Sequence, residues 1–260
     1  MIKKKNLLPI ILICISGISQ DINITLLKSE ISDSDALQIR KVYELERDYY
    51  FSVFEKFNKD VGVELYGDFE EYKHYQSLIS KNSKSNSGFS SSLLDVAIIY
   101  KKKDYINVVN HELSHLILQE SLPNCPKWLD EGLAEYFEYF QFDENHYQLR
   151  LQFHKIRRVA KWIKINKVKL SKFIKQSDET WIEKNKKPDF FSSSVSYCLV
   201  LFMQEKNILK QLLKSSMNEK SYKKIIENSY PKGFENFQTD FESHILLVDK
   251  LDEKILKFSN

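Results

Sequence analysis

The sequence feature that most constrains this fold is a pair of helical segments joined by a short turn that contains two prolines. Apolar side chains recur at helical spacing over residues 105–120 and again over residues 127–139. The turn between them reads Leu-Pro-Asn-Cys-Pro. Proline ends one helix and is tolerated in the first turn of the next. We therefore expect two helices that fold back antiparallel and share one face.

The first of these helices contains the sequence His-Glu-Leu-Ser-His at residues 111–115. At helical geometry His111 and His115 lie about 40° and about 6 Å apart on one face, where both imidazoles can bind one Zn²⁺. Glu112 stands beside the first histidine, within reach of a water bound to that metal. A carboxylate in this place can act as general base on water whose pKa the metal has lowered. The motif therefore predicts a hydrolytic zinc centre with Glu112 as its catalytic base.

The second helix offers the third protein ligand that a catalytic zinc needs. Residues 128–137 read Trp-Leu-Asp-Glu-Gly-Leu-Ala-Glu-Tyr-Phe, and folding back would bring Glu131 over the histidine face. Glu135 follows one helical turn later on the same face. We predict that Glu131 binds the metal and that Glu135 accepts the outer N–H of a bound histidine, His111 in the simplest arrangement.

Together, residues 111–115 and 128–137 resemble the active-site segment of the gluzincin metallopeptidases, the thermolysin and aminopeptidase-N type, and more closely the small bacterial peptidase MA-like domains. In that family the two histidines and the first glutamate of W-L-x-E-G-x-A-E-Y-F bind zinc. The glutamate inside the histidine motif is the base. The resemblance implies the same roles here for His111, His115, Glu131 and Glu112. It also implies a zincin-like catalytic domain that hydrolyses peptide bonds.

The sequence departs from that family in two ways that bear on its activity. Fifteen residues separate His115 from Glu131, a shorter gap than in the larger enzymes, which implies a tighter turn. The G-x-M-E-N motif with which aminopeptidases hold a substrate N-terminus is absent, and the only nearby glycine, Gly88, begins Gly-Phe-Ser-Ser-Ser. The resemblance therefore implies an endopeptidase rather than an aminopeptidase.

Two further features have a functional and a structural interpretation. Tyr197 is the candidate for the family's oxyanion-stabilising tyrosine, since a phenol can donate to the charge on a tetrahedral intermediate. The alternative is a tyrosine packed in an apolar helix face with its hydroxyl satisfied locally. The strand expected at residues 95–100 resembles the edge strand along which such enzymes bind an extended peptide. Its alternative is an ordinary interior strand.

The remaining pattern predicts an α+β fold. Strand and helix signals alternate before the histidine motif. After a turn-rich segment at residues 143–146 the chain is mostly helical, with a break at 230–233. We expect a zincin-like region over residues 20–145 and a mainly helical region over residues 146–260. The expected early elements are a helix at 33–57 capped by Ser32 or Ser34, a strand at 61–66, a helix at 69–79, a loop or irregular hairpin at 80–92, and the strand at 95–100.

Residues 1–19 have the pattern of a signal peptide. Three lysines precede an apolar stretch over residues 7–18, which is too short for the roughly 20 residues of a transmembrane helix, and small residues precede a cleavage point after Ser19. An uncleaved anchor and lipidation at Cys14 are the alternatives, the second disfavoured by the bulky Ile13. We expect export to the periplasm, cell surface or medium, with no stable transmembrane span after cleavage. Export would allow Cys125 and Cys198 to pair, although two buried thiols are the favoured interpretation.

Charge and glycine content exclude several partners. The chain has 39 basic and 36 acidic residues, and without the three lysines of the signal segment the two counts are equal. No large positive field therefore indicates nucleic acid or an anionic membrane as the main partner. Six glycines provide no Gly-rich phosphate loop. The short lysine runs at 101–103 and 184–187 are interpreted as solvated turns, with docking of an acidic partner as the alternative.

The sequence as a whole thus predicts an exported zinc-dependent metallopeptidase whose partner is a peptide or protein substrate. Two other functions stay open. One is a zinc-containing binding or assembly module without proteolysis. The other is a metallohydrolase that acts on a non-peptide amide or ester, such as a cell-wall fragment. Nothing in the sequence specifies an oligomeric state.

Overall fold

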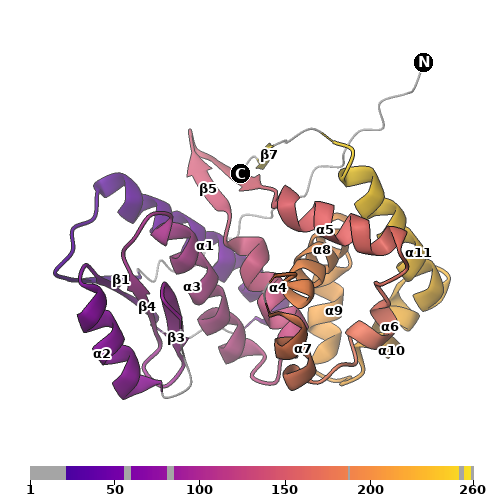
Figure 1. Cartoon of the computed structure of the whole chain (residues 1–260), viewed down its shortest axis with the longest axis horizontal. Coiled ribbons are helices and arrows are strands. Elements are labelled where there is room, and N and C mark those ends of the chain that lie inside the picture. Colours follow the sequence, from indigo (N-terminus) through magenta and orange to yellow (C-terminus); the bar gives the residue numbers. More distant parts are fainter. Residues whose placement is uncertain (1–21, 56–59, 81–84, 187, 252–254, 259–260) are drawn as a thin grey trace.

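The computed structural model describes residues 22–55, 60–80, 85–186, 188–251 and 255–258. The expected signal peptide at residues 1–19 lies outside them. Figure 1 shows the sheet with α1, α2 and α3 at one end of the molecule and the later helices at the other, with α4 between them. The chain is a mixed α+β protein, as predicted. Within the described residues, no helix combines the length and the apolar character needed to cross a bilayer.

A four-stranded mixed sheet has the strand order β1-β2-β4-β3. Strands β1 (Asn23–Leu27), β2 (Gly62–Tyr66) and β4 (Val96–Tyr100) are parallel, and β3 (Gly88–Ser91) pairs antiparallel with β4. The strand expected at residues 95–100 is therefore an interior strand, and its proposed edge position belongs to β3. This edge strand lies within the stretch expected to be a loop or irregular hairpin. Gly88 permits it, because a Cβ there would stand 2.6 Å from Ile99 Cδ1.

Helices cover both faces of this sheet. Helix α1 (Asp33–Phe54) packs with α3 (Tyr105–Ser121) in the main core on one face, while α2 (Phe69–Ile79) packs on the other face around Tyr72. Of the two expected caps for α1, Ser32 is the one observed, since its hydroxyl accepts a 3.0 Å hydrogen bond from the backbone N–H of Asp35. The histidine-bearing helix α3 packs against the buried apolar side chains of α1.

The predicted helical hairpin is present, and a β-hairpin follows it. Helix α4 (Lys127–Phe137) leads into β5 (Phe140–Asp143) and β6 (His146–Arg150), and β7 (Ile255–Phe258) completes a second sheet. The sequence predicted only a turn here. That turn, Glu144 and Asn145 at φ 47° and 64°, has the left-handed backbone of a tight hairpin connection. The expected boundary between residues 145 and 146 thus falls inside a hairpin.

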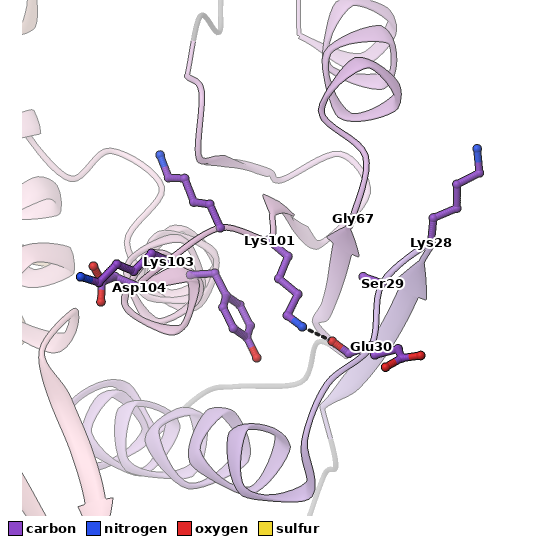
Figure 2. Close-up of a pocket in the computed structure, with 9 residues that line it drawn as sticks. Lys28, Ser29, Glu30, Gly67, Lys101, Lys103 and Asp104 are labelled. Atoms are coloured by element: carbon purple, nitrogen blue, oxygen red, sulfur yellow. Dashed lines mark hydrogen bonds between the residues drawn. The ribbon is translucent and has the colours of Figure 1, made fainter.

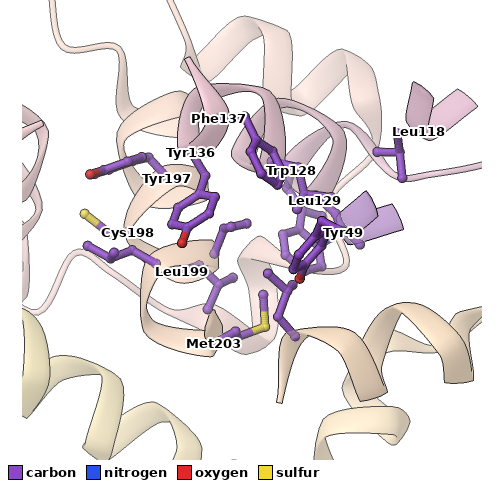
Figure 3. Packing of buried hydrophobic residues seen from close by; sticks show 14 of the residues in the cluster. Tyr49, Leu118, Trp128, Leu129, Tyr136, Phe137, Tyr197, Cys198, Leu199 and Met203 are labelled. Atoms are coloured by element: carbon purple, nitrogen blue, oxygen red, sulfur yellow. The ribbon is translucent and has the colours of Figure 1, made fainter. Parts of the chain in front are cut away.

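The rest of the described chain is helical. Helix α8 is buried along nearly its whole length. It packs against α4, as Figure 3 shows for the side chains around Leu199 and Met203. One buried apolar cluster runs from Ile22 to Val248, and Cys125 and Cys198 are free thiols. The seven helices are α5 (Phe153–Lys164), α6 (Leu170–Phe173), α7 (Asp178–Lys184), α8 (Phe191–Glu205), α9 (Leu209–Ser216), α10 (Tyr222–Ser229) and α11 (Gly233–Val248).

Gly132 sets the distance between α4 and α8. A Cβ at this position would stand 2.8 Å from the carbonyl oxygen of Ser196 and 2.8 Å from Val200 Cγ2. Both are closer than real Cβ contacts, and one of them is backbone that cannot rotate away. The two helices can therefore approach each other this closely only because residue 132 has no side chain.

We predict that Gly132→Ala destabilises the protein. Alanine gains about 1 kcal/mol of helix propensity, but forcing α8 outward should cost about 1–3 kcal/mol, so a net loss of up to about 2 kcal/mol is expected. Urea unfolding measures this change. Gly62→Ala is the control, because its Cβ would meet neighbours only at 3.4 Å and 3.5 Å. Equal stability of the Gly132→Ala variant and the wild type would contradict this account of the contact.

Candidate metal centre

The three residues predicted as metal ligands converge at the contact between α3 and α4. The Nε2 atoms of His111 and His115 are 3.3 Å apart, and the carboxylate oxygens of Glu131 lie 3.8 Å and 3.9 Å from them. Ligands about 2.1 Å from a tetrahedral ion are about 3.4 Å apart, so the two imidazoles already have the required separation. Glu131 would have to move closer for one of its oxygens to bind the same ion, since Oε2 is the oxygen near His111 and Oε1 is the one near His115. Two imidazoles and a carboxylate are a donor set that suits zinc.

A carboxylate holds the outer nitrogen of each histidine. Asp130 accepts from Nδ1 of His115 at 2.6 Å, and Glu138 accepts from Nδ1 of His111 at 3.2 Å. These contacts place the ring protons on Nδ1 and leave both Nε2 lone pairs facing the common point. The side chains of both carboxylates are mostly buried, at 12% and 19% exposure, so the contacts are shielded from water.

The charges of this cluster shift its pKa values in opposite directions. Burial disfavours a charged imidazole, but the hydrogen bond and negative charge of Glu138 outweigh it and raise the pKa of His111 to about 10. For His115 burial likewise opposes the charged ring, and Asp130 raises its pKa. Burial would raise the pKa of Glu131, yet the positive charges of His115, Lys127 and His111 lower it to about 2. The negative charge around His111 therefore favours a proton on this ring in the metal-free protein.

Glu135 does not make the contact predicted for it. Its carboxylate pairs with the Nζ of Lys155 on α5 and accepts a 3.2 Å hydrogen bond from the side-chain amide of Gln152. Glu138 contacts His111 instead, since it lies nearly one helical turn further along α4 and its carboxylate reaches Nδ1. The prediction that Glu135 contacts His111 is therefore wrong. Glu135 instead links α4 to α5.

Lys127 is a member of the site that sequence reasoning missed. Its Nζ lies 2.7 Å from Oε1 of Glu131 and 3.8 Å from Asp130. Because Lys127 and Glu131 are four residues apart on one helix, their spacing was the available signal. The lysine binds the oxygen of Glu131 that lies nearer His115, so Oε2, the oxygen nearer His111, keeps a free lone pair.

Tyr197 lies in the core of the protein. It has no exposed surface, and its hydroxyl accepts a 3.1 Å hydrogen bond from the backbone N–H of Gln152. This is the geometry of a locally satisfied packing tyrosine. Contact with a substrate would require the phenol to leave this hydrogen bond and reach solvent.

Glu112 stands on the flank of α3 beside the converging ligands. Its side chain is half-buried, and its negative charge acts on His111 and on Tyr72 of α2. The predicted base therefore lies close enough to His111 for its charge to act on that ring, while Asp130 and Glu138 contact the Nδ1 atoms of the two rings.

Two clefts on the described surface bear on the residues singled out in the sequence. One, of about 330 Å³, has Glu138 in its wall and adjoins the metal centre. The larger, of about 910 Å³, is at the carboxyl ends of β1, β2 and β4 and contains none of the predicted site residues. Its lysines diverge in Figure 2, and Lys101 is already bonded to the carbonyl oxygen of Glu30. This arrangement agrees with the interpretation of residues 101–103 as a solvated turn.

A buried acid underlies the histidine helix. Glu46 on α1 has no exposed surface and faces Ser114, whose hydroxyl is 3.2 Å from that of Tyr50. Burial raises the pKa of Glu46 well above its ordinary value, and Ser114 and His111 oppose this rise only in part. Nothing in the sequence pattern indicated that this position is a buried acid.

We predict that Glu138→Gln and Asp130→Asn each weaken zinc binding by about 10- to 100-fold, because each removes a charged acceptor that orients a histidine. Competition with a chromophoric chelator measures this affinity. Glu135→Gln is the matched control on the same helix. It should lower stability, since Lys155 loses its partner, and leave zinc affinity unchanged. An equal loss of affinity in all three variants would contradict the assignment.

We predict that Glu46→Met flattens the pH dependence of stability. The folded state holds the Glu46 proton more tightly than the unfolded state, so its stabilising contribution is complete below an ordinary glutamate pKa. That contribution is lost as pH rises towards the folded-state pKa. As pH rises above about 5 towards the folded-state pKa, the wild type should lose up to about 1.4 kcal/mol per pH unit relative to the variant. Urea unfolding at several pH values measures this, with Glu44→Met as the surface control. Parallel curves would contradict the prediction.

Comparison with known proteins adds no family assignment. No protein-family model matches this chain, and no curated protein matches it in sequence. What can be said of the site therefore depends on its own geometry, in which two histidines and a glutamate from neighbouring helices are placed to hold one metal ion.

Proposed function

We propose that this chain is an exported zinc-dependent metallopeptidase with a zincin-like catalytic region. One observation carries the proposal: His111, His115 and Glu131 converge within 4.8 Å of one another while Glu112 flanks them on the same helix. Export is proposed from the charged and apolar pattern of the first residues alone. The catalytic assignment is supported by the convergence of the side chains that the sequence motif requires.

The donor set leaves a coordination position for the reaction. A zinc ion held by these three side chains would act as a Lewis acid on the substrate carbonyl and lower the pKa of an attacking water. Asp130 and Glu138 keep both imidazoles turned so that Nε2 faces the ion. Lys127 occupies one oxygen of Glu131 and leaves the other free.

Glu112 performs the proton transfers in this proposal. Its carboxylate accepts a proton from the attacking water and delivers that proton to the leaving amine, the general-base and general-acid sequence that amide hydrolysis needs. Half-burial beside α2 limits the conformations open to the side chain without removing it from solvent. The hydrolysis itself needs no further ionisable group of the chain.

The sheet edge supports cleavage within a chain rather than at its end. Strand β3 lies at the edge of the sheet and pairs among the described strands only with β4. It packs against α3, since a Cβ at Gly88 would stand 2.7 Å from Val108 Cγ1. An extended peptide added to β3 would therefore run past the histidine helix and could continue in both directions.

We predict that Glu112→Gln abolishes peptide hydrolysis while zinc content stays near one ion per chain. The amide cannot accept the proton of the attacking water, and loss of a general base lowers the rate by about 10²–10⁴-fold. Mass spectrometry of digests of an unfolded protein measures activity, and metal analysis measures zinc. Glu144→Gln, in the exposed hairpin turn, is the control.

Three outcomes would decide against the proposal. Retained hydrolysis in Glu112→Gln would overturn the mechanism. A zinc-loaded wild type that cuts no peptide would favour a binding or assembly module. Cleavage of peptidoglycan fragments without cleavage of proteins would favour the non-peptide hydrolase.

A further inference from the structure

Charged side chains line the cleft beside the metal centre. Its volume of about 330 Å³ is at the lower end for ligand pockets, and α4, α5 and α8 all contribute to it. Glu138 connects it to the catalytic region, because this carboxylate lines the cleft and also contacts Nδ1 of His111 at 3.2 Å. A substrate chain advances about 3.3 Å per residue, so we expect a group that enters this cleft to belong to a residue near the cleaved bond.

Most charges in this cleft are already compensated. Lys155 pairs with Glu135, and Glu138 pairs with His111. Arg158 differs, since no carboxylate of the described residues lies within ion-pair distance of it. Its guanidinium carbon stands 5.8 Å from the centre of the Phe190 ring, which also lines the cleft. The cleft therefore presents one half-buried positive charge without a counter-ion.

The backbone at Phe190 holds this arrangement in place. Phe190 precedes α8 at φ 49° and ψ 46°, a left-handed conformation that bulky residues rarely adopt. Such a conformation persists only where the surrounding structure imposes it, and it often marks a functional site. Here it places an aromatic face against Arg158, which leaves the polar N–H groups of the guanidinium for another partner.

We propose that this cleft binds a carboxylate of the peptide substrate through Arg158, so that the enzyme prefers acidic peptides. The inference rests on the proposed function and names its substrate class. Guanidinium presents a planar fork of N–H donors that matches a carboxylate, and partial burial strengthens that contact. The carboxylate is either an Asp or Glu side chain near the cleaved bond or the C-terminal group of a short peptide.

A paired peptide library tests the proposal. Each sequence is present with Glu or Gln at one position and as a C-terminal acid or amide, and mass spectrometry follows its cleavage by the zinc-loaded enzyme. Acidic members should be cut about tenfold faster than their neutral pairs, and Arg158→Gln should remove this preference while neutral members keep their rate. The Glu/Gln arm and the acid/amide arm separate the two sources of carboxylate.

Arg157→Gln is the matched control for this variant. Arg157 is the neighbouring residue on α5, is exposed, and lies over Phe153 rather than in the cleft. Its replacement should leave the preference intact. Arg158→Lys keeps the positive charge but lacks the planar set of guanidinium N–H donors. This variant should retain only part of the preference for acidic peptides. Thermal unfolding of all three variants shows whether a change in preference follows from a loss of folding.

A binding experiment separates this proposal from the proposed proteolysis. The same library is equilibrated with the zinc-loaded Glu112→Gln variant, and the retained peptides are identified. If the wild type cuts peptides with no carboxylate preference, the inference about Arg158 is overturned and the peptidase stands. If nothing is cut but acidic peptides are retained in an Arg158-dependent way, the cleft stands and the proteolytic function falls. If no peptide is cut and none is selectively retained, both the proposed function and the inference about Arg158 are overturned.

Discussion

The position of α4 between α3 and α8 is the constraint on which the candidate centre depends. One flank of α4 carries Glu131 towards the two histidines, and another carries Gly132 against the backbone of Ser196. Because α8 is buried along nearly its whole length, it cannot retreat to relieve a clash. Both sides of α4 are thus fixed by packing, and the carboxylate is held at the height of the imidazoles before any metal binds. Such preorganisation reduces the ordering that ligand binding would otherwise require.

The ligands themselves could be predicted from the sequence because each depends on local geometry. Helical spacing alone places His111 and His115 on one face, and the proline turn forces the next helix to return along that face. Within α4 the spacing placed Glu131 and Glu135 on one face. It could not show that Glu138, the residue that follows α4, meets His111 in place of Glu135, because that depends on the offset between two helices and on where α5 presents Lys155. Contacts between elements distant in the chain decided the point.

The same reasoning explains the errors in the fold. Strands β2 and β4 were predicted from their sequence patterns, whereas β3 is four residues of Gly, Phe and Ser with little strand signal of its own. Its pairing with β4 comes from tertiary contact, and it moves the expected edge from residues 95–100 to Gly88–Ser91. The β5–β6 hairpin was missed for a related reason, since its turn lacks glycine and Asn145 alone supplies the usual left-handed residue.

The acidic flank of α4 shows why the helical half of the chain belongs to the site. Four carboxylates, Asp130, Glu131, Glu135 and Glu138, stand on one short helix and would repel one another if they were unpaired. Cations from three elements offset this repulsion: the two histidines of α3, Lys127 of α4 itself and Lys155 of α5. If α5 were removed, Glu135 would be left without its cation. The residues after 146 therefore neutralise a carboxylate of α4 as well as adding apolar packing, and α5 and α8 also form the wall of the cleft that adjoins the centre.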